Sequence, residues 1–348
     1  MTTKLTLLLL CSVAPLVAGA DTLDVYGQLT GKTVLMPSAL PRLPDSIIAN
    51  LPTDRTDAIA RVERALSEQG LEIVQDGPHF VRVFGGRTPE PLTNAPLRGA
   101  ELATSPGKEG LGPGLIDFNH ADLDQVLLIY ASLSQRTVLR PMTLPAPTIN
   151  LKTQCPLTKE EALYAFETVL ALNDICVVED GPKFAQIVPM RQRDQIKTGA
   201  PKLEPGAKLF DPKKVPSMGS SARPGPVPPP PGPLTEAQRI EQEFERLRQA
   251  FYDFMHGPDP SKHPTQRLLI LYASLAGKTA MRSKDFGDRP IQFHVDTPLT
   301  KSELLYAIET TFTLNNLAII PVDDGKIRLG HVSEVKKPRS SRVGARLV

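Results

Sequence analysis

Two pairs of adjacent carboxylates are the residues in this sequence whose types and spacing could do chemistry. Glu179-Asp180 and Asp323-Asp324 each stand beside a glycine, Gly181 or Gly325, between two apolar runs. Paired carboxylates can transfer protons as general acid and base, or bind Ca²⁺ through their oxygens. Asp is also favoured at glycine-containing turns for a local reason, because its side chain hydrogen-bonds the turn backbone. We expect this structural role for both pairs, at the tips of β-hairpins.

The remaining chemical candidates lack the spacing that a catalytic or metal site needs. No two of the histidines stand at the helical or loop spacing of zinc ligands. The sequence contains no nucleophile elbow, P-loop or dinucleotide-binding motif, and no strand leads into the glycine-rich residues 110–114. We therefore predict that the protein is not an enzyme and has no catalytic residues, no cofactor and no metal. The histidines are His79, His120, His256, His263, His294 and His331.

A repeated pair of short motifs indicates an architecture and not a reaction. The segment Tyr130-Ala131-Ser132-Leu133 recurs at residues 272–275, and Pro-Leu-Thr-Lys follows each Tyr at the same interval, at residues 156–159 and 298–301. The match continues without a gap beyond the second motif. Such self-similarity indicates an internal repeat of one small folded unit. Because Tyr130 and Tyr272 fall on apolar helical faces, we interpret them as core residues whose hydroxyls reach the core's edge.

The middle copy, residues 114–190, defines the elements that the unit must contain. Its second helix begins at a capping box, in which Thr158 is followed three residues later by Glu161. Apolar residues at helical spacing follow that box, and alternating apolar residues then predict a closing hairpin. In chain order, the expected elements are a strand at 116–118, a helix capped by Asn119, strands at 137–139 and 149–151, the second helix, and the hairpin at 175–188.

The other two copies repeat this order with different fidelity. In the third copy we expect strands at 279–281 and 291–293 and a second helix capped by Thr300. The first copy is degenerate: residues 26–33 align with 272–279, and Thr53 is the expected helix cap. The pattern predicts an α+β fold of three small tandem modules (helix-strand-strand-helix-strand-strand) joined by Pro/Gly-rich linkers.

Composition supports compact units separated by extended connectors. The chain has 348 residues, a net charge of +2 and 35 prolines, which concentrate between the copies. The small net charge gives no electrostatic footprint for nucleic acid, and proline runs favour semi-rigid extended spacers. We expect a signal peptide at 1–20, modules at 21–86, 114–190 and 263–333, a linker at 87–113, a Pro-rich linker at 191–234, an amphipathic helix at 235–256 and a basic tail at 334–348.

The N-terminus has the pattern of an export signal. Lys4 precedes a short apolar run at 5–17, and small residues at 18–20 offer a cleavage site. We expect export to the periplasm; the alternative is an uncleaved signal that anchors the protein in the inner membrane.

Two cysteines, Cys155 and Cys176, follow the signal in the sequence. In an oxidising compartment they could form a disulfide. The alternative is that both act as small buried hydrophobic residues. The third copy has Thr297 and Ala318 at the corresponding positions, so the unit itself does not require a bridge.

The order of elements resembles the amino-terminal domain of type II secretion system secretins (protein D). It is similar also to the short N-terminal domain shared by secretins and TonB-dependent transducers. The resemblance implies a module that contacts components of a secretion machine and has no catalytic residues. This chain departs from the family because no residues after Val332 could supply the secretin pore. The segments that carry the resemblance are residues 116–119 leading into 121–123, the strand at 137–139, residues 156–161, and the hairpin at 175–188 followed by Pro189.

These observations predict a non-enzymatic periplasmic interaction module. We expect an accessory or separated periplasmic part of a type II secretion, secretin-like or type IV pilus machine, with protein partners from that machine and with homo-oligomers as a further option. Neither nucleic acid nor a small-molecule substrate is expected. The alternatives are an envelope scaffold that binds peptidoglycan or another cell-wall polymer, and an enzyme whose site these motifs do not reveal.

Overall fold

A computed structural model of the protein describes residues 22–41, 43–44, 46–85, 99–103, 110–202, 208–210, 264–281, 291–323 and 325–335. The chain divides into two compact units. The first unit takes its described residues from 1–133 and 146–174, and the second from 134–145 and 175–348. The predicted signal peptide and the predicted helix at 235–256 lie outside the described residues.

The first unit contains two small sheets and the helices that pack with them. In its three-stranded sheet, β3 (Phe80–Gly85) pairs in parallel with β1 (Thr33–Leu35) and antiparallel with β2 (Leu71–Asp76). The other sheet pairs β4 (Asp117–Ala121) antiparallel with β6 (Ile149–Lys152). The helices, in chain order, are α1 (Thr22–Thr30), α2 (Ser46–Ala49), α3 (Arg55–Glu68), α5 (Gly99–Ala103), α6 (Leu123–Ser134) and α7 (Lys159–Leu172).

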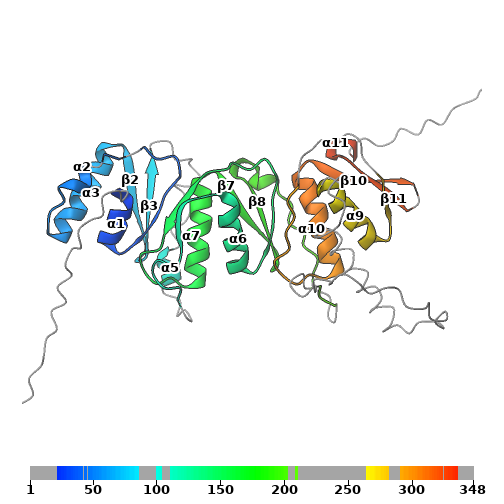
Figure 1. Cartoon of the computed structure of the whole chain (residues 1–348), viewed down its shortest axis with the longest axis horizontal. Helices are drawn as coiled ribbons and strands as arrows, with labels where there is room; N and C mark the ends of the chain where they lie inside the picture. Colours follow the sequence, from blue (N-terminus) through cyan, green and yellow to red (C-terminus); the bar gives the residue numbers. More distant parts are fainter. Residues whose placement is uncertain are drawn as a thin grey trace, which may run out of the picture. The chain divides into compact units, whose positions relative to one another are not determined.

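A cluster of buried apolar side chains joins α1 and α3 to the sheet β1-β3-β2. Figure 1 shows these helices beside the sheet. The helical spacing of Val62 and Leu66 puts both side chains on one face of α3, and both are fully buried. Val81 and Val83 alternate along β3 and bring side chains from the sheet into the same cluster. The two periodicities, one helical and one of strands, therefore converge on one core.

The second unit contains two three-stranded sheets with the same strand pairing as the sheet β1-β3-β2. In one sheet, β8 (Phe184–Pro189) pairs in parallel with β5 (Thr137–Leu139) and antiparallel with β7 (Ile175–Asp180). In the other, β11 (Lys326–His331) pairs in parallel with β9 (Thr279–Ala280) and antiparallel with β10 (Leu317–Asp323). The remaining elements are the 3₁₀ helix η1 (Met190–Gln195) and the helices α9 (Pro264–Ala276), α10 (Lys301–Leu314) and α11 (Val332–Val335).

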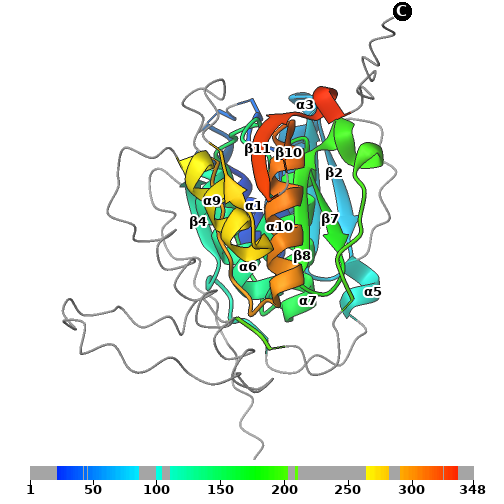
Figure 2. The same ribbon diagram turned by 90° about the vertical axis from the view of Figure 1, so that its right-hand side faces the viewer.

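Helices α9 and α10 lie side by side against the hairpin β10–β11 (Figure 2). Leu269, Ile308 and Phe312 are fully buried there together with Ile327 and Leu329 from the hairpin. The protein is therefore α+β, with several small mixed sheets that are each packed with helices. None of the helices in the described part of the chain combines the length and apolar character that a membrane span requires.

A tyrosine–glutamate hydrogen bond occurs at the same sequence separation in all three repeated segments. Tyr26 Oη donates to Glu63 at 2.7 Å, Tyr130 Oη to Glu167 at 2.9 Å, and Tyr272 Oη to Glu309 at 2.5 Å. All three tyrosines are buried. The expected core role of Tyr130 and Tyr272 is thus confirmed. Burial, followed by the hydrogen bond to the carboxylate, raises the pKa of Tyr26 and of Tyr272 well above the usual range.

Most expected strands and turns are confirmed, and the hairpins turn at Gly77 and Gly181, both with positive φ. The strand expected at 291–293 is wrong, since these described residues are not in a strand.

Two expected helix caps are also wrong. Asn119 lies inside β4, and α6 is instead preceded by Asp122, whose side chain accepts from Gln125 N at 2.8 Å. Helix α3 is capped by Asp54 and not by Thr53: the Asp54 carboxylate accepts from the backbone N–H groups of the first turn. In both cases a carboxylate next to the expected residue takes the position, because it accepts hydrogen bonds and also favours the positive end of the helix.

The ranges predicted as linkers contain structure where they are described. Helix α5 lies within 87–113, and Leu111 in the same range bridges to Leu157. Phe210, in the predicted Pro-rich linker, bridges to Leu299 and is 2% exposed. Only residues 334–335 of the predicted basic tail are described, and they belong to α11.

The predicted capping box at Thr158 and the predicted helix cap at Thr300 are confirmed, and they give a first testable expectation. Thr158 Oγ1 accepts from Glu161 N at 3.1 Å while Glu161 Oε2 accepts from Thr158 N at 2.8 Å; Thr300 and Glu303 repeat the arrangement. Replacing Thr158 with Ala should lower the free energy of unfolding by about 1 kcal/mol, because the first turn of α7 loses its acceptor. Urea unfolding followed by circular dichroism measures the change. Thr158→Ser keeps the hydroxyl and should stay within about 0.5 kcal/mol of the wild type.

Candidate protein-interaction site

In the first unit, the hairpin β2–β3 contacts the start of α7 through a buried polar cluster. Asp76, the last residue of β2, is 0% exposed and accepts a hydrogen bond from Arg82 Nε at 2.7 Å. Tyr164 Oη donates to the same carboxylate and accepts from the Arg82 guanidinium. Gly99 N, the first residue of α5, donates to the other oxygen of Asp76 at 3.0 Å. One carboxylate therefore holds a hairpin and two helices together.

The second unit contains the same arrangement around Asp180. This carboxylate is 1% exposed, and it accepts from Gln186 Nε2 at 2.7 Å and from Tyr306 Oη. Gly199 N and Ala200 N donate to its other oxygen at 2.9 Å and 3.0 Å. Asp180 thus joins the hairpin β7–β8 to the start of α10 and to the segment that follows η1.

The acidic residue of each capping box meets a basic residue of the hairpin turn. His79 Nδ1 lies 2.6 Å from Glu161 Oε1, and Lys183 Nζ lies 2.8 Å from Glu303 Oε2. Lys183 Nζ also donates to the carbonyl of Pro298 at 3.0 Å. Glu161 and Glu303 are both buried, so each carboxylate caps its own helix and fixes a hairpin at the same time.

Backbone groups at the edge of each contact are paired in the same way. Thr33 Oγ1, at the start of β1, accepts from Gln154 N at 3.2 Å. Thr137 Oγ1, at the start of β5, accepts from Asp296 N at 3.4 Å. Both threonines are 0% exposed. The two contacts therefore have corresponding hydrogen bonds at their edges, and each has its own buried aspartate at the centre.

An aromatic pair completes each contact. The ring of Phe80 lies edge-on to that of Tyr164, with centroids 5.5 Å apart, and Phe184 meets Tyr306 at 5.6 Å in the same way. Such edge-to-face pairs add to the stabilisation that burial alone gives.

Two surfaces, the hairpin face and the helix start, meet in each of these contacts. The hairpin face is the set Thr33, Asp76, His79 and Phe80, and its counterpart is the set Thr137, Asp180, Lys183 and Phe184. We call Glu161 with Tyr164, and Glu303 with Tyr306, the helix start.

The tyrosines of the helix starts have raised pKa values, and their burial is the main cause. Burial, together with the hydrogen bond to Asp180, raises the pKa of Tyr306 to about 12. Burial and the hydrogen bond to Asp76 also raise the pKa of Tyr164, against the opposing effect of Arg82. Since the unperturbed pKa of tyrosine is about 10, neutral Tyr306 stabilises the fold fully below that pH. The contribution is lost as the pH rises from about 10 through about 12.

This shift predicts a difference between two titrations of the tyrosinate ultraviolet absorbance. In the folded chain, Tyr306→Phe should leave the absorbance at pH about 10 unchanged and reduce it only near pH about 12. In urea, the same substitution should reduce the absorbance already at pH about 10. A reduction at pH about 10 in the folded protein would contradict the buried contact.

The expected role of the paired carboxylates needs correction in one respect. Asp180 does lie at a hairpin turn, but its hydrogen bonds reach Tyr306 and residues 199–200, so local turn geometry alone does not explain it. Glu179 next to it is exposed and pairs with Arg136 at 2.6 Å. Asp323 is exposed, and Asp324 lies outside the described residues.

The sequence did contain a signal for Tyr164 and Tyr306. They occupy the same position in the two similar copies, whereas the degenerate first copy has Ala60 there. The partner residue Asp76 matches Asp180 in the same way. What could not be read from this pattern is that each tyrosine binds the hairpin of the preceding copy.

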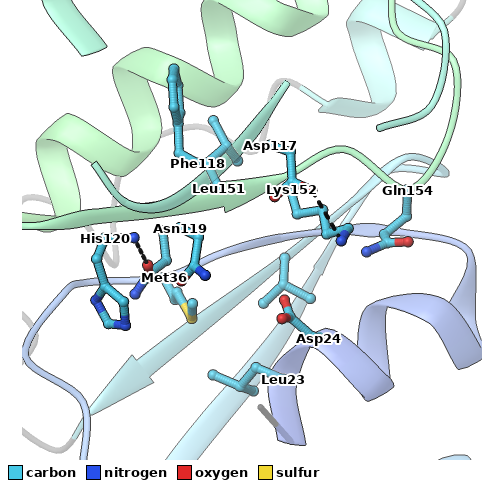
Figure 3. A pocket seen from close by; sticks show the side chains of 12 residues that line it. Leu23, Asp24, Met36, Asp117, Phe118, Asn119, His120, Leu151, Lys152 and Gln154 are labelled. Atoms are coloured by element: carbon cyan, nitrogen blue, oxygen red, sulfur yellow. Dashed lines mark hydrogen bonds and ion pairs between the residues drawn. The ribbon is translucent and has the colours of Figure 1, made fainter. Parts of the chain in front are cut away.

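A polar pocket of about 520 Å³ lies in the first unit between α1 and the sheet β4-β6 (Figure 3). Asp24 lies on the α1 side, while Asn119, His120 and Lys152 come from the strands (Figure 3). Lys152 Nζ pairs with Asp117 at 3.1 Å, and His120 N donates to Asn150 Oδ1 at 2.7 Å. His120 has a φ of 54°, which is uncommon for a residue other than glycine. The pocket offers amide, carboxylate and ammonium groups that suit the binding of a polar ligand.

The remaining predicted site residues are not brought together. Neither Cys155 nor Cys176 forms a disulfide in the structure, and Cys176 is 6% exposed. Burial raises the pKa of the Cys155 thiol, which lowers its reactivity. A disulfide between the two cysteines in an oxidising compartment stays a prediction. Within the described ranges, no group of three or more His, Cys, Asp and Glu residues could hold a metal ion; His256 and His263 lie outside them.

Comparisons of the chain with protein-family models, with curated proteins and with solved structures gave no match.

Proposed function

We propose that the chain is a non-enzymatic interaction protein made of three tandem modules joined by Pro/Gly-rich linkers. It acts in the periplasm as an accessory or separated part of a secretin-type secretion machine or a type IV pilus machine. The observation that carries this proposal is that one contact occurs twice: a hairpin face receives the helix start of the next copy, around Asp76 and again around Asp180. Because the same kind of surface binds the next module in two copies, it is suited to binding modules of this type.

The resemblance to the amino-terminal domain of secretins supports the choice of system. That family uses small modules of this element order to contact other envelope proteins. The three-stranded sheets also have edge strands, such as β2 and β7, and strand addition at an edge is a common way to bind a peptide segment. Several modules in one chain would raise the avidity for a multimeric partner.

Affinity purification after cross-linking in living cells tests this function. We expect the tagged full chain to recover a secretin, another secretion component or a pilus component. A variant that lacks residues 1–20 is the matched control, because it should stay in the cytoplasm and recover none of them. Recovery of no machine component by the exported chain would contradict the proposal.

Cell fractionation tests the location. Release of the chain by osmotic shock is expected for a periplasmic protein, whereas recovery in the inner-membrane fraction would indicate an uncleaved signal.

A second candidate function is the binding of peptidoglycan or another cell-wall polymer. The observation that favours it is the polar pocket, in which Asn119, Asn150 and Gln154 supply amide groups and Asp24 a carboxylate. Side chains of these types bind sugar hydroxyls and peptide groups through hydrogen bonds. Sedimentation with purified sacculi tests it: the full chain should co-sediment, and Asn150→Ala should weaken that binding. Failure of the wild type to co-sediment would exclude this candidate.

A further inference from the structure

Each of the two contacts joins a hairpin face to a helix start, and one further helix start and one further hairpin face are exposed. The helix start of α7 occupies the hairpin face of β2–β3, and the helix start of α10 occupies that of β7–β8. The corresponding part of α3 is exposed in the first unit, and the corresponding part of β9 and β10–β11 is exposed in the second. These two surfaces are the first helix start and the third hairpin face.

The third hairpin face is identified by its backbone. Thr279 N donates to the carbonyl of Gly325 at 2.7 Å, just as Thr33 N donates to His79 O and Thr137 N to Lys183 O, both at 2.8 Å. Asp323 lies opposite Lys326 in the strand register, as Asp180 lies opposite Phe184. A register shift between Pro321 and Asp323 adds one residue to β10, so Asp323 takes the place opposite Lys326 and Val322 precedes it. Thr279, Asp323 and Lys326 are all exposed, whereas their counterparts in the two occupied faces are buried.

The first helix start is identified by its position after the N-cap. Asp57 stands three residues after the capping Asp54, as Glu161 stands after Thr158. Ala60 then takes the position of Tyr164. Both Asp57 and Ala60 are exposed, whereas Glu161 is 1% exposed.

The two exposed surfaces differ from the occupied ones in a complementary way. Where a hairpin face has Phe, the helix start that covers it has Tyr, and the rings pack edge to face. The third face has Lys326 in place of Phe, and the first start has Ala60 in place of Tyr. In a contact of the same geometry, the small alanine would leave room for the side chain of Lys326, which stands one residue after the position of His79 and Lys183, and its ammonium would face Asp57. The acidic capping position would again meet a basic hairpin residue, as in the other two contacts.

We propose that the helix start of α3 in one copy binds the third hairpin face of a second copy. In this contact Asp57 pairs with Lys326, and Arg64, one turn beyond Ala60 on α3, supplies a donor for Asp323 in place of the tyrosine hydroxyl. The contact is head-to-tail, because two different surfaces of the same chain meet in it. This inference deepens the proposed function, and rests on its tandem docking modules, by naming one partner as a second copy of the chain.

Sedimentation velocity of the mature full chain over a concentration series tests this contact. We expect reversible self-association that weakens at high salt, because the two pairs are charged and lie at the surface. Asp57→Lys and Lys326→Glu should each lower the association constant by about tenfold or more, since like charges then face each other. Mixing the two variants in equal amounts should restore association, because the reversed charges match between copies. All variants should keep the wild-type circular dichroism spectrum.

Glu68→Lys is the matched control, since this exposed residue lies at the other end of α3 and should leave association unchanged. A wild-type chain that stays monomeric at every concentration would overturn the inference. So would self-association that both single variants retain, because the chain would then use another surface. If the monomeric chain still recovers machine components from cells, only this inference fails and the proposed function stands.

Discussion

Replacing Arg82 with Met is expected to lower the free energy of unfolding by about 3–5 kcal/mol. Arg82 is 3% exposed and holds the carboxylate of Asp76, which is 0% exposed. Without the guanidinium, the described residues leave Asp76 with the hydrogen bonds from Tyr164 and Gly99 N, and none of them supplies a cation to its buried charge. The midpoint of urea unfolding of the full chain measures the loss.

The double variant Asp76→Leu with Arg82→Met separates charge burial from packing. Because it removes both charges, it should unfold at higher urea than Arg82→Met alone, although the hydroxyl of Tyr164 then loses its acceptor. If the double variant were less stable than the single one, the cost would come from packing and not from the unpaired carboxylate. Arg61→Met, an exposed arginine of α3, is the matched control and should change stability by less than about 0.5 kcal/mol.

Asp180→Ala is expected to have the second large effect. The substitution removes the acceptor of four donors: Tyr306 Oη, Gln186 Nε2, Gly199 N and Ala200 N. A buried donor left without an acceptor costs about 1–3 kcal/mol, and Gln186 is 1% exposed. Some donors will find water, so we expect a total loss of about 2–5 kcal/mol.

The neighbouring carboxylate provides an internal control. Glu179 is exposed, with 62% of its side chain accessible, and it makes one surface ion pair with Arg136. Glu179→Ala should therefore change stability by less than about 1 kcal/mol. Equal effects of the two substitutions in urea unfolding would contradict the assignment of Asp180 as the centre of the contact. Hydrogen exchange should in addition show faster exchange of the amides at the start of α10 in Asp180→Ala, since the hydrogen bond between Tyr306 and the hairpin is lost.

The order of elements was readable from the sequence because it depends on local rules. The spacing of Val62 and Leu66, the capping boxes at Thr158 and Thr300, and the glycine turns each act over a few residues. The repeat then let one well-defined copy inform the others, and the tyrosine–glutamate hydrogen bonds at equal separation agree with that alignment. Where two nearby residues could cap a helix, as with Thr53 and Asp54 or with Asn119 and Asp122, the aspartate is the residue that accepts from the first turn.

The candidate site could be predicted only in part. Periodicity assigns a residue to a face of its own helix or strand, but it does not say which other segment will cover that face. Asp180 illustrates the difference: its carboxylate stands at a hairpin turn, as the glycine beside it indicates, and its hydrogen-bond partners come from residues 186, 199, 200 and 306. No short-range pattern contains those separations.

The sequence by itself determined the repeat, the α+β class, the hairpins and the caps of α7 and α10, because these follow from spacing and local hydrogen bonding. Only the tertiary structure decided that Asp76 and Asp180 are buried and that each binds the tyrosine of the following copy. The physical reason is that a carboxylate is favourable both in an exposed turn and in a buried cluster with enough donors. Which of the two it occupies depends on whether distant residues bring those donors to it.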